Sequence, residues 1–362
     1  LSLESDLGTA HMSGRFDLRE GVAAWRSALQ QSEFQCRGQL DVAVLAQTLP
    51  RTLHLREDIQ ISAGTVDWDV SNKKDGELYL LSGHLATEGI QAIKAGEQVH
   101  LTRPVDVQLL VRHAEDRFEV EQLKGRSTFV AFSGRGDLDQ AQFALRADLD
   151  QLQQELQQFV ALPGVDLAGS LEGHVQWHAA PETETLLAQG NLTGRGLSVS
   201  LSPSRRWRES ELNLKFQGEI DARSDVRQLA TGSVELVADV DRLKIAVTKP
   251  IQMHETNWPL AIEADGILST WRNRLQMIGM SDLPPVNGRL DAKVEVTASR
   301  DLTQLTSATI TVEQLDTTIG DRRINEPSLR FTGNGQWDGK SRQFSAGSIE
   351  AVSYTHLRAH ET

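Results

Sequence analysis

Two histidine pairs are the first residues in this chain whose type and spacing could do chemistry. His356 and His360 are four residues apart, as in helical metal sites. However, residues 353–362 resemble the translated read-through of a sequencing adapter, and we expect them to be a non-native tail outside the fold. His174 and His178 have the same spacing on an expected strand, where they would stand about 13 Å apart and could not share one metal ion.

Motifs for other chemistry are absent from the sequence. It contains no HExxH, GxxxxGK[ST] or GxSxG motif and no EF-hand loop. Cys36 is the single cysteine, which excludes an internal disulfide and a multi-cysteine metal site. The basic segment 205–208 could touch anionic head groups, although a solvated loop is the simpler interpretation. We therefore expect no enzyme activity, no cofactor and no metal.

The charge balance argues against nucleic acid as a partner. The 362 residues include 37 Lys and Arg against 50 Asp and Glu, which gives a net charge of −13. Broad nucleic-acid surfaces need many cations to displace counterions. No run of about 18 apolar residues is present, so we expect no membrane-spanning helix within this stretch. Because the sequence begins at Leu1 rather than Met, we interpret it as an internal fragment.

Alternation of apolar and polar residues is the dominant pattern. In residues 290–298 every second residue is apolar, and polar or charged residues stand between them. A period of two is typical of strands with one apolar face in an antiparallel sheet. We predict that residues 290–298 and 308–315 pair as antiparallel strands. Their shared apolar face is expected to contain Leu290, Val294, Val296, Ile310 and Val312.

Short glycine-rich segments are interpreted as the turns between strands. Segments 133–137, 193–196 and 333–335 each combine glycine with polar residues, which is the usual composition of turns. Residues 241–242 are expected to form another turn.

Helical spacing is confined to three short segments, 41–49, 148–160 and 269–280. Asp148 is a plausible N-cap with Gln151 three residues later, and prolines follow the first two segments. We expect the second helix to be the longest and to pack its apolar side against the sheet. That side would contain Leu149, Leu152, Leu156 and Phe159.

These helices indicate a repeat. Gly64, Val66 and Trp68 recur 109 residues later as Gly173, Val175 and Trp177, and a looser third copy includes Gly288. A period near 110 is long for a solenoid repeat and suits a module of one helix and several strands. We predict one elongated region over residues 1–352, with modules at about 35–145, 146–265 and 266–352.

One sequence pattern recurs along the chain: a short helix that begins with Leu-Asp, then Leu-Pro, then an alternating segment bounded by glycine. This pattern resembles the AsmA-like and TamB-like proteins of bacterial envelopes. It is clearest in residues 147–173 and covers about residues 35–350. The resemblance implies a grooved β-sheet in the periplasm, anchored in the inner membrane through a missing N-terminal segment. It also implies transport of phospholipid along an apolar groove, with inner- and outer-membrane proteins as further partners.

The expected fold is therefore mostly β: a long, curled antiparallel sheet forming a groove, with a few short amphipathic helices. The alternative is a series of β-sandwich or barrel-like modules. The expected function is a bridge-like conduit for phospholipid acyl chains. Two alternatives are a scaffold for outer-membrane protein assembly that uses exposed strand edges, and a non-catalytic β-rich part of an envelope enzyme.

The acyl-binding residues are expected on the apolar faces of the most regular strands, because an apolar slot needs no catalytic group. Each methylene buried there would contribute about 0.8 kcal/mol. The expected lining is Val234, Leu236, Val240, Ile245, Val247, Leu290, Val294, Val296, Ile310 and Val312.

Overall fold

The computed structural model contains twenty-one strands and three helices within its described residues. The described residues are 2–14, 32–49, 52, 55–101, 103–114, 117–161, 164–180, 182, 184–202, 205–221, 228–252, 254–277, 280, 283–341 and 343–353. The chain divides into two compact units, Leu1–Gln176 and Trp177–Thr362.

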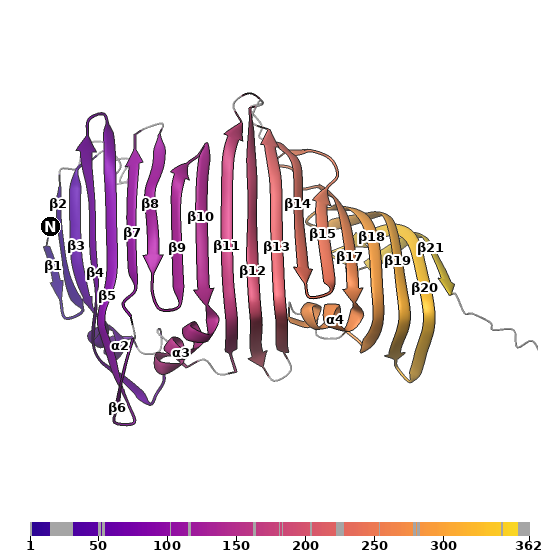
Figure 1. Ribbon diagram of the computed structural model, residues 1–362, viewed down its shortest axis with the longest axis horizontal. Coiled ribbons are helices and arrows are strands. Elements are labelled where there is room, and N and C mark those ends of the chain that lie inside the picture. Colours follow the sequence, from indigo (N-terminus) through magenta and orange to yellow (C-terminus); the bar gives the residue numbers. More distant parts are fainter. Residues whose placement is uncertain are drawn as a thin grey trace, which may run out of the picture. The chain divides into compact units, whose positions relative to one another are not determined.

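The first unit contains the strands up to β10, most of β11, and two helices (Figure 1). Its elements are β1 Ser2–Ser5, β2 Gly8–Gly14, β3 Phe34–Asp41, α2 Val42–Thr48, β4 Ile59–Asp75, β5 Leu78–Lys94, β6 Glu97–His100, β7 Asp106–His113, β8 Phe118–Arg126, β9 Val130–Asp137, β10 Gln140–Asp148, α3 Leu149–Phe159 and β11 Asp166–Ala180.

The second unit contains the remaining strands and one helix. Its elements are β12 Thr185–Ser202, β13 Arg205–Asp221, β14 Gln228–Ala238, β15 Asp241–Val247, β16 Ile251–Gln252, β17 Trp258–Ile267, α4 Leu268–Met277, β18 Val286–Ala298, β19 Leu302–Ile319, β20 Arg322–Asp338 and β21 Gln343–Ser353.

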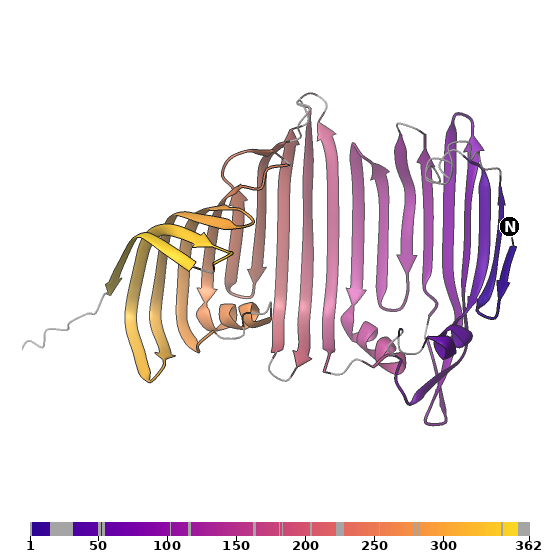
Figure 2. The same cartoon turned by 180° about the vertical axis from the view of Figure 1, so that it is seen from behind.

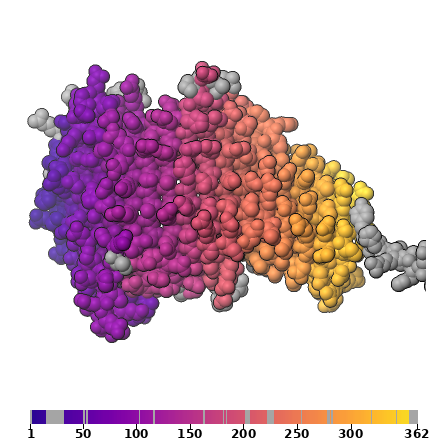
Figure 3. Space-filling view, in the orientation of Figure 1, coloured from indigo at the N-terminus to yellow at the C-terminus, as the bar shows by residue number. Residues whose placement is uncertain are grey.

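Both units are antiparallel meanders in which each long strand pairs with the next one along the chain. The short strands β6 and β16 are side branches that pair with β5 and β14. Side chains therefore form bands in chain order across the surface of each unit (Figure 3). In the described ranges, the first strand of a unit does not pair with the last strand of the same unit, so neither unit closes into a barrel. The expectation of an open antiparallel sheet is confirmed, and the alternative of closed modules does not hold.

Several glycine-rich segments lie inside strands, which corrects the turn predictions. Residues 133–137 belong to β9, 193–196 to β12 and 333–335 to β20. The chain between β14 and β15 turns at residues 239–240, so the prediction of a turn at 241–242 is also wrong. Glycine is used here for close packing: a Cβ on Gly134 would stand 2.4 Å from the ring of Phe143 on the neighbouring strand.

All three predicted helices are present, and α3 is the longest. Asp148 caps α3 by accepting a hydrogen bond from the backbone N–H of Gln151 at 2.9 Å, as expected. The predicted buried side is only partly right. Phe159 is buried, but the leucines are half-buried, and Glu155 is buried with hydrogen bonds from Gln151 and Thr128. Those bonds allow a carboxylate to take a position that periodicity assigns to apolar residues.

The repeat has a structural counterpart at shifted positions. A glycine with positive φ lies near the start of the strand after each helix, at Gly64, Gly169 and Gly288. Gly64 thus corresponds to Gly169 rather than to Gly173. The three-module division stays a prediction. Pro50, Leu162, Pro163 and the tail from residue 354 onward lie outside the described residues.

Candidate functional site: an apolar sheet face and its helix-covered end

One face of the second unit's sheet is apolar from β12 to the last strand. Directly paired residues share a face, and the pairing joins Leu192 to Leu214, Leu214 to Leu236 and Leu236 to Leu243. Further along, Ile245 pairs with Ile262, which pairs with Val294. Nine consecutively paired strands span about 38 Å at about 4.8 Å per strand.

Nine of the ten predicted lining residues lie on this apolar face. Leu290 pairs with Val312, and Val296 pairs with Leu305 across a bulge, which confirms the predicted pairing of β18 with β19. Lys293 and Glu295 between them are exposed. Val240 is the exception: it lies in the turn between β14 and β15 and is 63% exposed, so it does not line the face.

Sequence reasoning missed several members of this face. Phe216 pairs with Val234, Ile262 pairs with Ile245, and Phe331 pairs with Ile310. Phe216 and Phe331 lie within alternating runs, so the signal was present. In the strand that contains Ile262, the next residues on the same face are Ala264 and Gly266. Because these residues are small, the alternation of apolar and polar residues is hard to recognise there.

The apolar face is largely uncovered. Among the described residues only twelve apolar side chains are buried, and most of the face is half-buried. Val234 is 41% exposed, and Ile349 on the edge strand is 63% exposed. In a sandwich a second sheet about 10 Å away would cover such residues. Soluble proteins rarely leave apolar patches beyond a few hundred Å² open, so this face requires an apolar covering partner.

The first unit presents the same kind of face. Cross-strand pairing places Trp68, Leu85, Val107 and Gly125 in one row across β4, β5, β7 and β8, and the row continues through Phe132 of β9 to Leu145 of β10. A Cβ on Gly125 would stand 2.2 Å from the ring of Phe132. The Phe132 ring therefore lies over Gly125 on the neighbouring strand and adds to the apolar face.

Helix α4 covers one end of the second unit's face (Figure 2), and a buried ionic cluster holds it there. Arg274 Nε lies 2.7 Å from Glu209 Oε1, and Arg274 Nη1 lies 2.6 Å from Asp241 Oδ2. Thr270 Oγ1 also donates to Asp241 Oδ2. The guanidinium stacks 4.8 Å from the Trp271 ring centroid. All the groups that join helix to sheet are therefore hydrogen-bonded, as buried charges must be.

The chemistry of the cluster is structural. Although burial opposes the charge of Arg274, its hydrogen bonds to Glu209 and Asp241 raise its pKa above the ordinary value. Gly266 is required beside the cluster because its φ is +138° and a Cβ there would stand 2.0 Å from Asp241 Oδ1.

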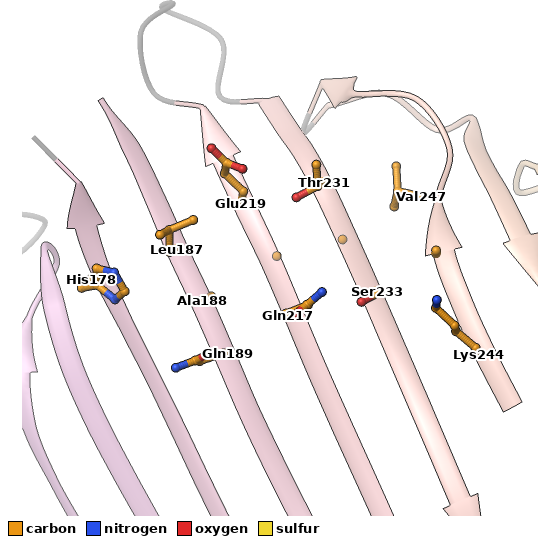
Figure 4. A pocket seen from close by; sticks show the side chains of 13 residues that line it. His178, Leu187, Ala188, Gln189, Gln217, Glu219, Thr231, Ser233, Lys244 and Val247 are labelled. Carbon is orange, nitrogen blue, oxygen red and sulfur yellow. The ribbon is translucent and has the colours of Figure 1, made fainter. Parts of the chain in front are cut away.

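A polar hollow of about 420 Å³ lies in the same unit but on the opposite face (Figure 4). Gln217 pairs with Gln189 and Ser233, and the three side chains alternate with the apolar residues of their strands. Lys244 and Glu219 also contribute to the lining. Most of these side chains lie on the polar face, and Val247 is the one predicted acyl-binding residue that also lines the hollow.

His178 lines the polar hollow and His174 does not, which agrees with the expectation that the two histidines do not share one site. Within the described ranges, no group of three or more His, Cys, Asp and Glu side chains could hold a metal ion. Among the same residues, no helix is both long and apolar enough to cross a membrane. Comparisons of the chain with protein-family models, with curated proteins and with solved structures found no match.

Proposed function

We propose that the chain is part of a conduit for phospholipid acyl chains and that its uncovered apolar sheet faces are the binding surface. The observation that carries this proposal is the continuous apolar face across β12 to β21, whose residues are mostly half-buried up to β20 and exposed on β21. The face is about 38 Å wide and contains no ionisable group between Val234 and Ala308 along the row through Ile245, Ile262 and Val294.

The physical argument rests on what could cover such a face. An acyl chain matches it in polarity and needs no directed hydrogen bonds, and each methylene removed from water is stabilised by about 0.8 kcal/mol. Because the row crosses many strands without a polar interruption, a chain could move along it with small changes in energy. A periplasmic location and an envelope role remain part of the proposal and follow from the family resemblance.

The test is the phospholipid content of the purified chain after incubation with phospholipid vesicles. Val294→Asp with Ile310→Asp places two carboxylates on the apolar face, and we expect bound lipid to fall by more than about tenfold, a loss of 1.4 kcal/mol or more. Thr309→Asp with Thr311→Asp is the matched control, because both threonines alternate with Ile310 on the polar face. Equal lipid content in both variants, or no lipid in the unaltered chain, would refute the conduit.

A second candidate function, a scaffold that adds partner strands, is favoured by one observation. In the described part of the chain, β21 pairs with β20 alone, and ten of its eleven residues are exposed. A long free edge can accept a further strand through backbone hydrogen bonds. Ile349→Pro should then abolish capture of a strand-forming peptide. If the unaltered chain captures no such peptide, the scaffold function is excluded.

A further inference from the structure

Exposed aromatic residues mark one end of the second unit's apolar face. Cross-strand pairing runs from Trp258 through Ala298 and Thr303 to Trp337 and then to Phe344, so these residues form one row. The three aromatic side chains are 39%, 42% and 47% exposed. We call Trp258, Trp337 and Phe344 the aromatic rim.

The opposite end of the same strands is covered. Along β17 the apolar-face residues after Trp258 are Leu260, Ile262, Ala264 and Gly266, so side-chain size falls toward α4. Gly266 stands against Asp241 of the ionic cluster. The eight residue-to-residue steps from Trp258 to Gly266 span about 27 Å, whereas one leaflet of bilayer hydrocarbon is about 15 Å thick.

The tryptophans at the two ends differ in hydrogen bonding. Near α4, Trp207 Nε1 donates to Glu209 at 2.7 Å and Trp271 Nε1 donates to the carbonyl of Asp265 at 3.3 Å. Neither Trp258 nor Trp337 has a hydrogen-bond partner for its indole among the described residues. Polar loop residues lie directly beyond the rim, where Lys340 pairs with Asp301 at 2.9 Å.

The first unit has the same arrangement, with an aromatic row at one end of its strands and a helix at the other. Tyr79, His113 and Phe118 form one row across β5, β7 and β8, and the Tyr79 and His113 rings stack at 5.6 Å. This row lies at the strand ends away from Ala92, where α2 packs. An aromatic row opposite a helix-covered end therefore occurs in both units.

Indole and phenol rings favour the boundary between apolar and polar surroundings, because the ring is apolar and its N–H or O–H seeks a polar partner. Resting on the proposed function, we propose that the second unit binds its amphiphile in one orientation. The polar headgroup lies at the aromatic rim, where the free indole N–H groups of Trp258 and Trp337 donate to it. The acyl chains run along the strands toward Gly266 and α4.

The experiment uses tryptophan fluorescence and phospholipids brominated either near the headgroup end or near the methyl end of the acyl chain. In the unaltered chain, headgroup-end bromine should quench more strongly, and this excess should be lost in Trp258→Phe with Trp337→Phe. In that background, Ile262→Trp places a probe about 14 Å from the rim, and methyl-end bromine should quench it more strongly. Both probes are read as the change relative to the double-Phe background, and Glu263→Trp on the polar face is the matched control, which should add no quenching by either lipid.

The outcomes separate this inference from the conduit itself. If lipid still binds but the two brominated lipids quench equally, or in the opposite order, at the rim and at position 262, the proposed orientation is wrong. The conduit proposal is not affected by that result. Absence of quenching by either lipid, together with absence of bound lipid by mass spectrometry, overturns both. Because the aromatic exchanges keep ring volume close to the original and Trp258 and Trp337 are exposed, the folded state can be verified by unchanged circular dichroism.

Discussion

The two units hold their helices against their sheets by different means. In the first unit α2 and α3 contribute to an apolar cluster of Ala43, Ala46, Ile61, Ala92 and Phe159. In the second, the buried Glu209, Asp241 and Arg274 join α4 to the strand ends. Apolar contacts thus hold the helices against the sheet in the first unit, and these contacts need only matching shape. Charged groups hold α4 in the second unit, and a buried charge is stable only when every partner is present.

The polar faces of the two sheets differ in a related way. In the second unit one register row reads Lys215, Glu235, Lys244, Glu263 and Lys293, so that opposite charges alternate across five strands. The comparable row of the first unit reads Arg37, Asp69, His84, Gln108 and Lys124, in which His84 and Gln108 replace the strict alternation of lysine and glutamate. The second unit therefore depends more heavily on electrostatic complementarity.

Removing the cation of the ionic cluster should have the largest effect. Arg274→Ala leaves two buried carboxylates without their partner and should lower the free energy of unfolding of the second unit by about 4 kcal/mol. Urea unfolding, with hydrogen exchange to locate the loss, is the measurement. Arg323→Ala, which removes an exposed pair with Asp316, is the control and should leave the unfolding midpoint unchanged. Equal effects would show that the cluster is not the anchor.

Truncating the apolar cluster should have a somewhat smaller effect in the first unit. Phe159→Ala removes the one aromatic side chain of the cluster and should cost about 3 kcal/mol, because the helix end can partly collapse into the space. Unlike the Arg274 variant, its unfolding should be insensitive to added salt. A salt-dependent loss would contradict the proposed difference between the two anchors.

Reversing one charge in the alternating row should cost about 1 kcal/mol, because Lys244→Glu places like charges opposite Glu235 and Glu263. The matched control is Gln108→Ala in the comparable row of the first unit, which loses hydrogen bonds with Asp106 and Gln122 but creates no like-charge pair and should cost less. Thermal unfolding of the two variants measures the contrast. A larger loss from the control would remove the claimed difference between the polar faces.

The smallest expected effect is a pH dependence in the first unit. Burial lowers the pKa of His113, so the unfolded state binds the proton more readily than the folded state. Stability should therefore rise as pH increases through about 6.5, the ordinary histidine value, and fall below it. In His113→Gln this slope should disappear. Unfolding measured between mildly acidic and neutral pH tests the prediction, and an unchanged slope in the variant would disprove it.

Alternation in the sequence determined the fold class and most of the candidate site. A residue at every second position must face the same side of a strand, so the apolar face through Val294 and Ile310 and the pairing of β18 with β19 could be read locally. The N-cap at Asp148 was equally local, since its hydrogen bond spans three residues. The predictions of turns at Gly134 and Gly335 were wrong because these glycines lie inside strands, where the lack of a side chain leaves room for an aromatic ring from the neighbouring strand.

Only the tertiary structure decided which end of the face is covered and which remains open. Glu209, Asp241 and Arg274 are separated by more than thirty residues from one another, and no local pattern marks three charges that meet in a buried cluster. The alignment of Trp258 with Trp337 likewise depends on register across four strands, including bulges that shift the pairing. The sequence determines which side chains each strand carries. The difference between the aromatic end and the helix-covered end of the face depends on how the strands are paired.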